Sequence, residues 1–89
     1  MSAREPMPTA DGAEPPALVV DARGQRCPLP VIELARRIGE IPLGAVIAVL
    51  ADDPAAALDI PAWCRLRGQA SLGAWDTPDG PRHLVRRVS

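Results

Sequence analysis

Residues 18–38 read LVVDARGQRCPLPVIELARRI, and this stretch sets the architecture of the chain. The apolar residues at 18–20 predict a short strand ending near Asp21, and Gly24 permits a turn because glycine adopts positive φ at little cost. Pro28 and Pro30 suit the first turn of a helix, where a missing backbone N–H costs little. Apolar positions with helical spacing follow at Val31, Leu34, Ala35 and Ile38. We therefore predict a strand, a turn and a helix that ends at Gly39 or Pro42.

The next segment repeats the order of strand and helix. The run at 45–51 is apolar without alternation, which is typical of a central strand with a parallel neighbour. Asp52, Asp53 and Pro54 then predict a turn over 54–58. Because Pro61 interrupts a helical pattern, we predict that the second helix starts near Asp59 and continues to Arg67, where Gly68 closes it.

Two further strands complete the predicted fold. Residues 69–76 and 82–88 are joined by the turn sequence Pro78-Asp79-Gly80 and should pair as an antiparallel hairpin. The order βαβαββ predicts an α+β two-layer sandwich, with two helices on one face of a mixed four-stranded sheet. Residues 1–17 are predicted to be a disordered, proline-rich tail, and residues 18–89 a single domain.

The composition excludes several classes of chemistry. The 89 residues contain no Lys, Tyr or Phe, one His, two Cys and two Trp, with a net charge of −1. Without lysine there is no Schiff base and no Walker-type phosphate site. A lone histidine without a nearby serine argues against a Ser-His-Asp triad, and two cysteines with one histidine are too few for an ordinary structural zinc site. We expect no metal and no cofactor.

The same inventory bears on compartment and partners. Two cysteines do not form a disulfide scaffold, no signal peptide is recognisable, and the longest apolar run is far too short to span a bilayer. Few aromatic residues and a slightly acidic balance argue against direct nucleic-acid binding. We expect a cytoplasmic monomer that does not contact membranes.

Cys27 is the candidate reactive residue. It directly precedes the first turn of the predicted helix, where unpaired N–H groups and the helix dipole favour a thiolate, so we expect a thiol pKa lowered to about 7–8. Arg26 and Arg23 would stabilise the anion or contact a partner, and Pro28 and Pro30 would fix the geometry. No histidine or second cysteine lies in the segment, which suits a group carrier better than a hydrolase or a dithiol. The alternative is a buried small apolar residue.

Other polar residues receive structural interpretations. Cys64 is predicted to be a core thiol, with a resolving thiol as the alternative. His83 is predicted to lie at a surface or edge position, and Asp53 and Asp59 to be helix caps rather than a catalytic pair. Trp75 either packs under the sheet or lies partly exposed at a partner surface. Three arginines of the last predicted strand form a basic stripe: Arg82, Arg86 and Arg87. The stripe is predicted to be a solvated strand face, with a docking patch for an acidic partner as the alternative.

Residues 21–30, DARGQRCPLP, resemble the signature of the TusA (SirA-like) sulfur-carrier family. The segments Asp52-Asp53-Pro54 and 59–64 (DIPAWC) resemble its second block. The resemblance covers roughly residues 18–88 and implies a two-layer βαβαββ fold in which Cys27 accepts sulfane sulfur as a persulfide. It also implies a cysteine desulfurase or rhodanese-like donor and a downstream acceptor protein. Gly68-Gln69 departs from the Gly-His of many relatives.

We therefore interpret the chain as a sulfur-relay protein rather than an independent turnover enzyme. Roles in the family include tRNA thiolation, molybdenum-cofactor supply and sulfur oxidation. Two other functions stay open on sequence. A thiol redox or peroxide sensor would oxidise Cys27, and perhaps Cys64, to a sulfenic acid or a disulfide. A non-catalytic regulatory module would keep its function without the Cys27 thiol.

Overall fold

The secondary structure follows the predicted βαβαββ order. The computed structural model describes residues 15–89. Its elements are β1 (Leu18–Asp21), α1 (Leu29–Arg37), the 3-10 helix η2 (Ile38–Glu40), β2 (Val46–Leu50), α2 (Ala56–Arg67), β3 (Ala70–Thr77) and β4 (Gly80–Arg86). The first strand has the predicted bounds, and the bounds of the other three strands differ from the prediction by one or two residues.

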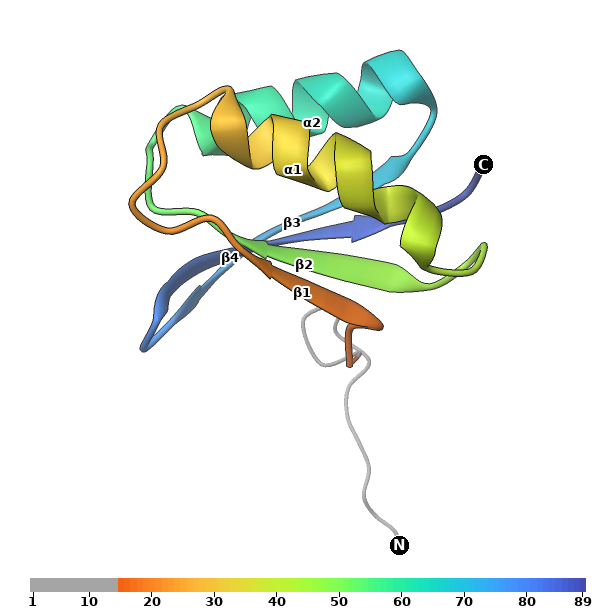
Figure 1. Ribbon diagram of the computed structural model, residues 1–89, viewed down its shortest axis with the longest axis horizontal. Helices are drawn as coiled ribbons and strands as arrows, with labels where there is room; N and C mark the ends of the chain where they lie inside the picture. Colours follow the sequence, from red (N-terminus) through yellow and green to blue (C-terminus); the bar gives the residue numbers. More distant parts are fainter. Residues whose placement is uncertain (1–14) are drawn as a thin grey trace, which may run out of the picture.

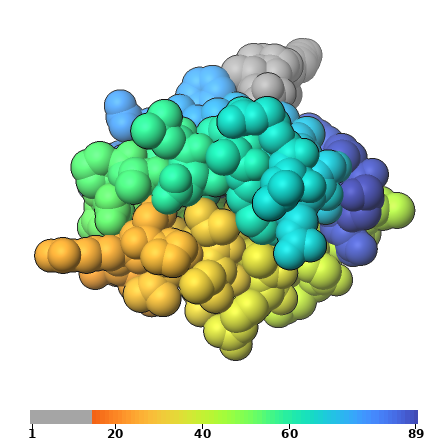
Figure 2. All heavy atoms as spheres, turned by 90° about the horizontal axis from the view of Figure 1, so that it is seen from above, coloured from red at the N-terminus to blue at the C-terminus, as the bar shows by residue number. Residues whose placement is uncertain are grey.

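The sheet has the order β1-β2-β4-β3, with β1 parallel to β2 and β4 antiparallel to both of its neighbours. Figure 1 shows α1 and α2 on the same face of this sheet, and the view from above in Figure 2 shows the two helices side by side across that face. The α+β two-layer sandwich with a mixed sheet is confirmed.

The main core lies between the sheet and the helices. Leu34 and Ile38 of the first helical segment pack there against Ile47 and Val49 of β2. Every residue of β2 is buried, as expected for a strand with neighbours on both sides. Ala35 was predicted to face this core but is exposed, because the buried stripe of α1 follows Pro30, Leu34 and then Ile38.

The start of the second helix differs from the prediction. α2 begins at Ala56 rather than near Asp59, so Pro61 lies inside it. Its first turn is tightened by i→i+3 bonds, in which the N–H groups of residues 56–58 donate to the carbonyls of residues 53–55. Burial of Ala56 and Ile60 against the core outweighs the one helical bond that Pro61 cannot make.

His83 was predicted to lie at a surface or edge position, and this prediction is wrong. The side chain is only 5% exposed. β4 lies between β2 and β3, where His83 is opposite Val49 on one side and Ala74 on the other. Because Val49 belongs to the helix-facing core, cross-strand alternation places the imidazole on that face as well.

The predicted disordered tail lies mostly outside the described residues, which begin at 15. Within the described part, the N–H of Ala17 already donates to the carbonyl of Val46 at 2.7 Å. Pairing with β2 therefore starts one residue before β1. Among residues 15–89, no helix is long and apolar enough to cross a membrane.

Candidate functional site

Cys27 lies in the loop between β1 and α1, directly before Pro28, which caps the helix. The thiol is partly buried, and the Cys27–Pro28 peptide bond is cis. Pro30 is buried in the first turn of α1, while Pro28 is exposed beside the cysteine. The predicted position of both prolines at the start of this helix is confirmed, and the sulfur therefore sits at the end of a rigid element.

The loop that carries Cys27 is held by the loop that follows β2. The N–H of Cys27 donates to Asp53 Oδ2 at 3.1 Å, and the N–H of Gly24 donates to Asp52 Oδ1 at 3.0 Å. The second oxygen of Asp53 accepts the N–H of Ala55 at 2.9 Å, immediately before α2. The N-cap of α2 is Ala55 and not the predicted Asp53, whose carboxylate instead holds the turn before the helix and the backbone of the cysteine.

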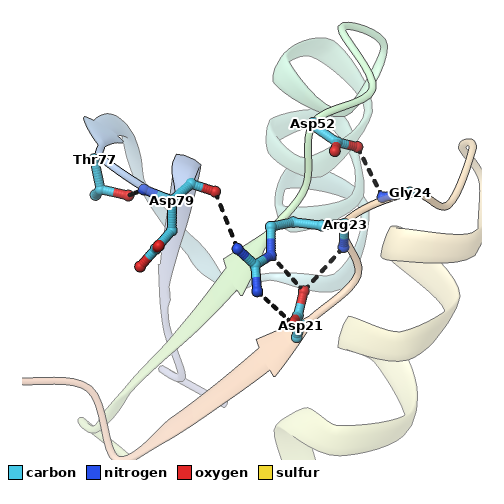
Figure 3. Close-up of polar contacts among 6 residues, drawn as sticks. All are labelled: Asp21, Arg23, Gly24, Asp52, Thr77 and Asp79. Carbon is cyan, nitrogen blue, oxygen red and sulfur yellow. Dashed lines mark hydrogen bonds and ion pairs between the residues drawn. The ribbon is translucent and has the colours of Figure 1, made fainter.

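The Arg23 side chain contacts two other parts of the chain, Asp21 and the turn that contains Asp79 (Figure 3). Its Nε and Nη2 donate to the two carboxylate oxygens of Asp21 at 2.9 and 2.8 Å. Its Nη1 donates to the carbonyl of Asp79 in the β3–β4 turn at 3.4 Å. The pair holds the pKa of Asp21 at about 2, so this guanidinium is engaged in tying the cysteine loop to the hairpin.

Arg26 differs from Arg23 in having a free side chain. It is exposed, and within residues 15–89 its guanidinium makes no hydrogen bond or ion pair. Its positive charge helps to lower the pKa of Asp53. Arg26 thus precedes Cys27 in the chain, but its charge acts on Asp53 and is not among the causes that shift the pKa of the thiol.

The expected lowering of the Cys27 pKa is wrong in direction. Burial raises the pKa of the thiol, and the carboxylates of Asp59 and Asp53 raise it further. The start of α1 offers little compensation, because both prolines lack an N–H, Leu29 N–H donates to the Arg26 carbonyl, and Cys27 N–H is bound to Asp53. The first turn of α1 therefore offers fewer free donors to a thiolate than a helix start without prolines.

Asp59 was predicted to be a helix cap, and this prediction is also wrong. α2 begins three residues earlier, and the Asp59 carboxyl lies close enough to the Cys27 thiol to raise its pKa. A signal for this contact was present in the sequence. Neighbouring parallel strands end at the same edge of a sheet, so the residues after β1 and after β2 must face each other.

The second cysteine belongs to the core. Cys64 is 1% exposed in the cluster between sheet and helices, and burial raises its thiol pKa to about 11. The prediction of a core thiol is confirmed. Trp75 is 40% exposed and opposite Arg82, on the sheet face away from the helices. In the described part of the chain, no group of three His, Cys, Asp or Glu side chains is arranged to hold a metal ion.

A partly buried cysteine at a strand-to-helix junction, with the buried Cys64 as the other thiol of residues 15–89, suits a carrier of a small group. The family model for the sulfurtransferase TusA matches residues 18–87 of this chain. The chain belongs to the TusA family. The function common to this family is that of a sulfur carrier.

Individual TusA relatives agree with this assignment. A protein of Archaeoglobus fulgidus named "Putative sulfur carrier protein" is 34% identical over 71 residues, covering 80% of this chain and 97% of that protein. "Putative sulfur carrier protein YrkF" of Bacillus subtilis is 30% identical over 70 residues, covering 79% of this chain but only 38% of the relative. The crystal structure of a SirA-like protein from Desulfitobacterium hafniense superposes with a TM-score of 0.64 at 26% identity, covering 78% and 93% of the two chains.

Proposed function

We propose that this protein is a sulfur-relay carrier in which Cys27 accepts sulfane sulfur as a persulfide and passes it to an acceptor protein. The observation that supports this most is the position of one partly exposed thiol, Cys27, directly before α1, while the other thiol, Cys64, is buried in the core. A carrier needs one accessible sulfur, and its partners bring the acids and bases.

The transfer is a thiol exchange on sulfur. The Cys27 thiol loses its proton and its sulfur attacks the outer sulfur of a donor Cys–S–SH group, forming a new S–S bond. The donor S–S bond breaks, and the donor cysteine leaves as a thiolate that takes up the proton. No electrons are gained or lost overall, so the step needs no redox cofactor. The reverse pattern delivers the sulfur to the acceptor's nucleophile.

The surface beside Cys27 fits contact with another protein. Leu29 and Ile32 on α1 are 48% and 44% exposed, and Leu58 in the first turn of α2 is 76% exposed. Apolar side chains of this size beside a reactive group favour protein docking, with Arg26 and Asp59 as charged neighbours. We propose a cysteine desulfurase or a rhodanese-like protein as the donor, and a cytoplasmic setting in which the thiol stays reduced.

The acceptor protein would belong to one of three pathways: tRNA thiolation, molybdenum-cofactor supply or sulfur oxidation. The redox-sensor function is disfavoured by two features of the thiols. A buried Cys64 is a poor resolving partner, and a raised pKa keeps Cys27 in the less oxidisable thiol form.

Incubation with a cysteine desulfurase and cysteine tests the relay. The intact protein should gain about 32 Da, the mass of one sulfur atom, and a reducing thiol should remove it. Cys27→Ser should show no adduct, whereas the matched variant Cys64→Ser should retain it. An unmodified wild type with both a desulfurase and a rhodanese donor, or an adduct that persists in Cys27→Ser, would contradict the proposal.

A further inference from the structure

One carboxylate joins the two segments that meet at the site. Asp53 Oδ2 accepts the N–H of Cys27 at 3.1 Å, and Asp53 Oδ1 accepts the N–H of Ala55 at 2.9 Å. The first bond holds the residue before Pro28, and the second holds the turn that leads into α2. Both oxygens are therefore used to fix the cysteine backbone relative to the second helix.

The Cys27 backbone has few other constraints. Pro28 follows it without an N–H, and the next donor, Leu29 N–H, binds the carbonyl of Arg26. The bond to Asp53 is a backbone link between this part of the loop and a segment 26 residues away, in addition to the packing of Cys27 against the core. Asp52 makes a similar bond to the N–H of Gly24, three residues before the cysteine in the same loop.

We propose that Asp53 is a positioning residue for sulfur transfer, which sets the orientation of Cys27 by holding its backbone against the start of α2. This inference rests on the proposed relay function. Misplacing a reacting atom by about 1 Å can slow a transfer by as much as 100-fold, so a single backbone bond at this place has a large effect on rate. Asp53 also places a negative charge beside the thiol, together with Asp59 from α2. The nearby positive group is Arg26, whose charge acts on Asp53. The first turn of α1 carries no acidic residue.

The test compares Asp53→Asn with Asp52→Asn, which removes the same charge from the adjacent residue. The first measurement is the rate of persulfide loading by a cysteine desulfurase with cysteine. The second is the pH profile of Cys27 alkylation by iodoacetamide, read by peptide mass spectrometry so that Cys64 is scored separately. Labelling of Cys64 reports loss of the fold, because this thiol is buried in the native protein.

For Asp53→Asn we expect loading to slow by about tenfold and the midpoint of the alkylation profile to fall by roughly half to one pH unit, since a charge beside the thiol is removed. Asp52→Asn should change neither by as much, and Cys64 should stay protected in both. A merely structural role would not move the alkylation midpoint. Where the wild type loads sulfur, an equal loading rate or an equal alkylation midpoint in the two variants overturns the inference. If Cys64 becomes labelled in Asp53→Asn, Asp53→Glu, which keeps the charge and both acceptors, must restore wild-type loading, or the inference fails.

Failure of the relay function has a separate signature. A wild type that takes up no sulfur from any donor contradicts the relay, while the alkylation midpoints of the two variants still decide whether Asp53 governs Cys27. Equal midpoints then overturn the positioning role, and a lower midpoint in Asp53→Asn alone supports it.

Discussion

At Cys27, a helix terminus and a pair of carboxylates act on the thiol in opposite senses. The helix dipole favours a thiolate, but its effect is about 0.3–1 kcal/mol at an exposed site. Burial and the carboxylates of Asp59 and Asp53 act against it, and the two prolines remove two of the N–H groups that would favour a thiolate. The neutral thiol is therefore favoured at Cys27, and this form is less readily oxidised than a thiolate.

This balance predicts a slow, pH-dependent reaction of Cys27 with iodoacetamide. Because its pKa is raised, the thiolate fraction at pH 7 is small, and the rate should rise about tenfold per pH unit to a midpoint above the ordinary thiol value of about 8.5. Cys64 is the internal control and should stay unlabelled in the folded protein. A midpoint at pH 7–8 would show that the helix terminus dominates after all.

The sequence predicts where Cys27 lies, at the start of the first helix, but not the direction of its pKa shift. Its place before Pro28 and Pro30 is a local feature, visible in the order of residues. The direction of its pKa depends on Asp53 and Asp59, which approach only after β1 and β2 pair and bring their following loops together. A contact between distant segments has no local pattern, and Asp59 was accordingly mistaken for a cap.

Among the elements, α2 carries an internal proline that its neighbours tolerate. Pro61 has no N–H to donate to the carbonyl four residues earlier, and a proline inside a helix costs about 3 kcal/mol relative to alanine. We expect Pro61→Ala to raise the free energy of unfolding by about 1–3 kcal/mol, measured by urea denaturation. Pro54→Ala is the matched control: it lies in the turn before α2, and its loss should lower stability by about 0.4–1 kcal/mol through the unfolded state. A destabilised Pro61→Ala would contradict this account.

The same helix ends on a glycine with left-handed geometry. Gly68 has a φ of 73°, and an added Cβ would meet only Ser89 Oγ at 3.7 Å, so the cost of Gly68→Ala comes from the backbone and not from crowding. We expect a loss of about 1 kcal/mol in the free energy of unfolding. Gly39→Ala is the control, because Gly39 has no positive φ and open space, and it should be neutral or stabilising by up to about 1 kcal/mol. Equal effects of the two variants would refute the backbone explanation.

Element boundaries show what local patterns can and cannot determine. The closing glycine of α2 and the strand at 18–21 were predicted at the observed residues, because each depends on nearby residues. α2 starts three residues before the predicted position, because the burial of Ala56 and Ile60 outweighs the penalty of Pro61. That burial exists only in the assembled core.

For the whole molecule, the insertion of β4 between β2 and β3 has the largest consequence. A hairpin at the end of a βαβ unit can add either of its strands next to β2, and the local sequence does not choose between them. Here β4 takes the inner place. His83 thereby becomes a buried residue of the helix-facing core, with Val49 and Ala74 opposite it.

This burial predicts that the protein loses stability in mild acid. Burial lowers the pKa of the His83 imidazole, and a hydrogen bond to the backbone of Ala51 only partly opposes the shift. The unfolded chain, with an ordinary histidine pKa of about 6.5, then binds a proton more readily than the folded one, so the free energy of unfolding falls as the pH drops below that value. Above it both states are neutral and the contribution is constant.

Urea denaturation between pH 7.5 and 5.5 isolates this effect. The carboxylates with lowered pKa values, Asp21 and Asp53, weaken the fold only at lower pH and do not interfere in this range. We expect wild-type stability to decline through the range and His83→Gln, which keeps a side-chain donor without a titratable group, to show a flatter profile. The pH-independent part of its stability change measures the packing cost of the substitution, so only the slope bears on the titration. Parallel profiles for the two proteins would mean that the imidazole is not buried in the folded state, and that β4 does not hold the central place in the sheet.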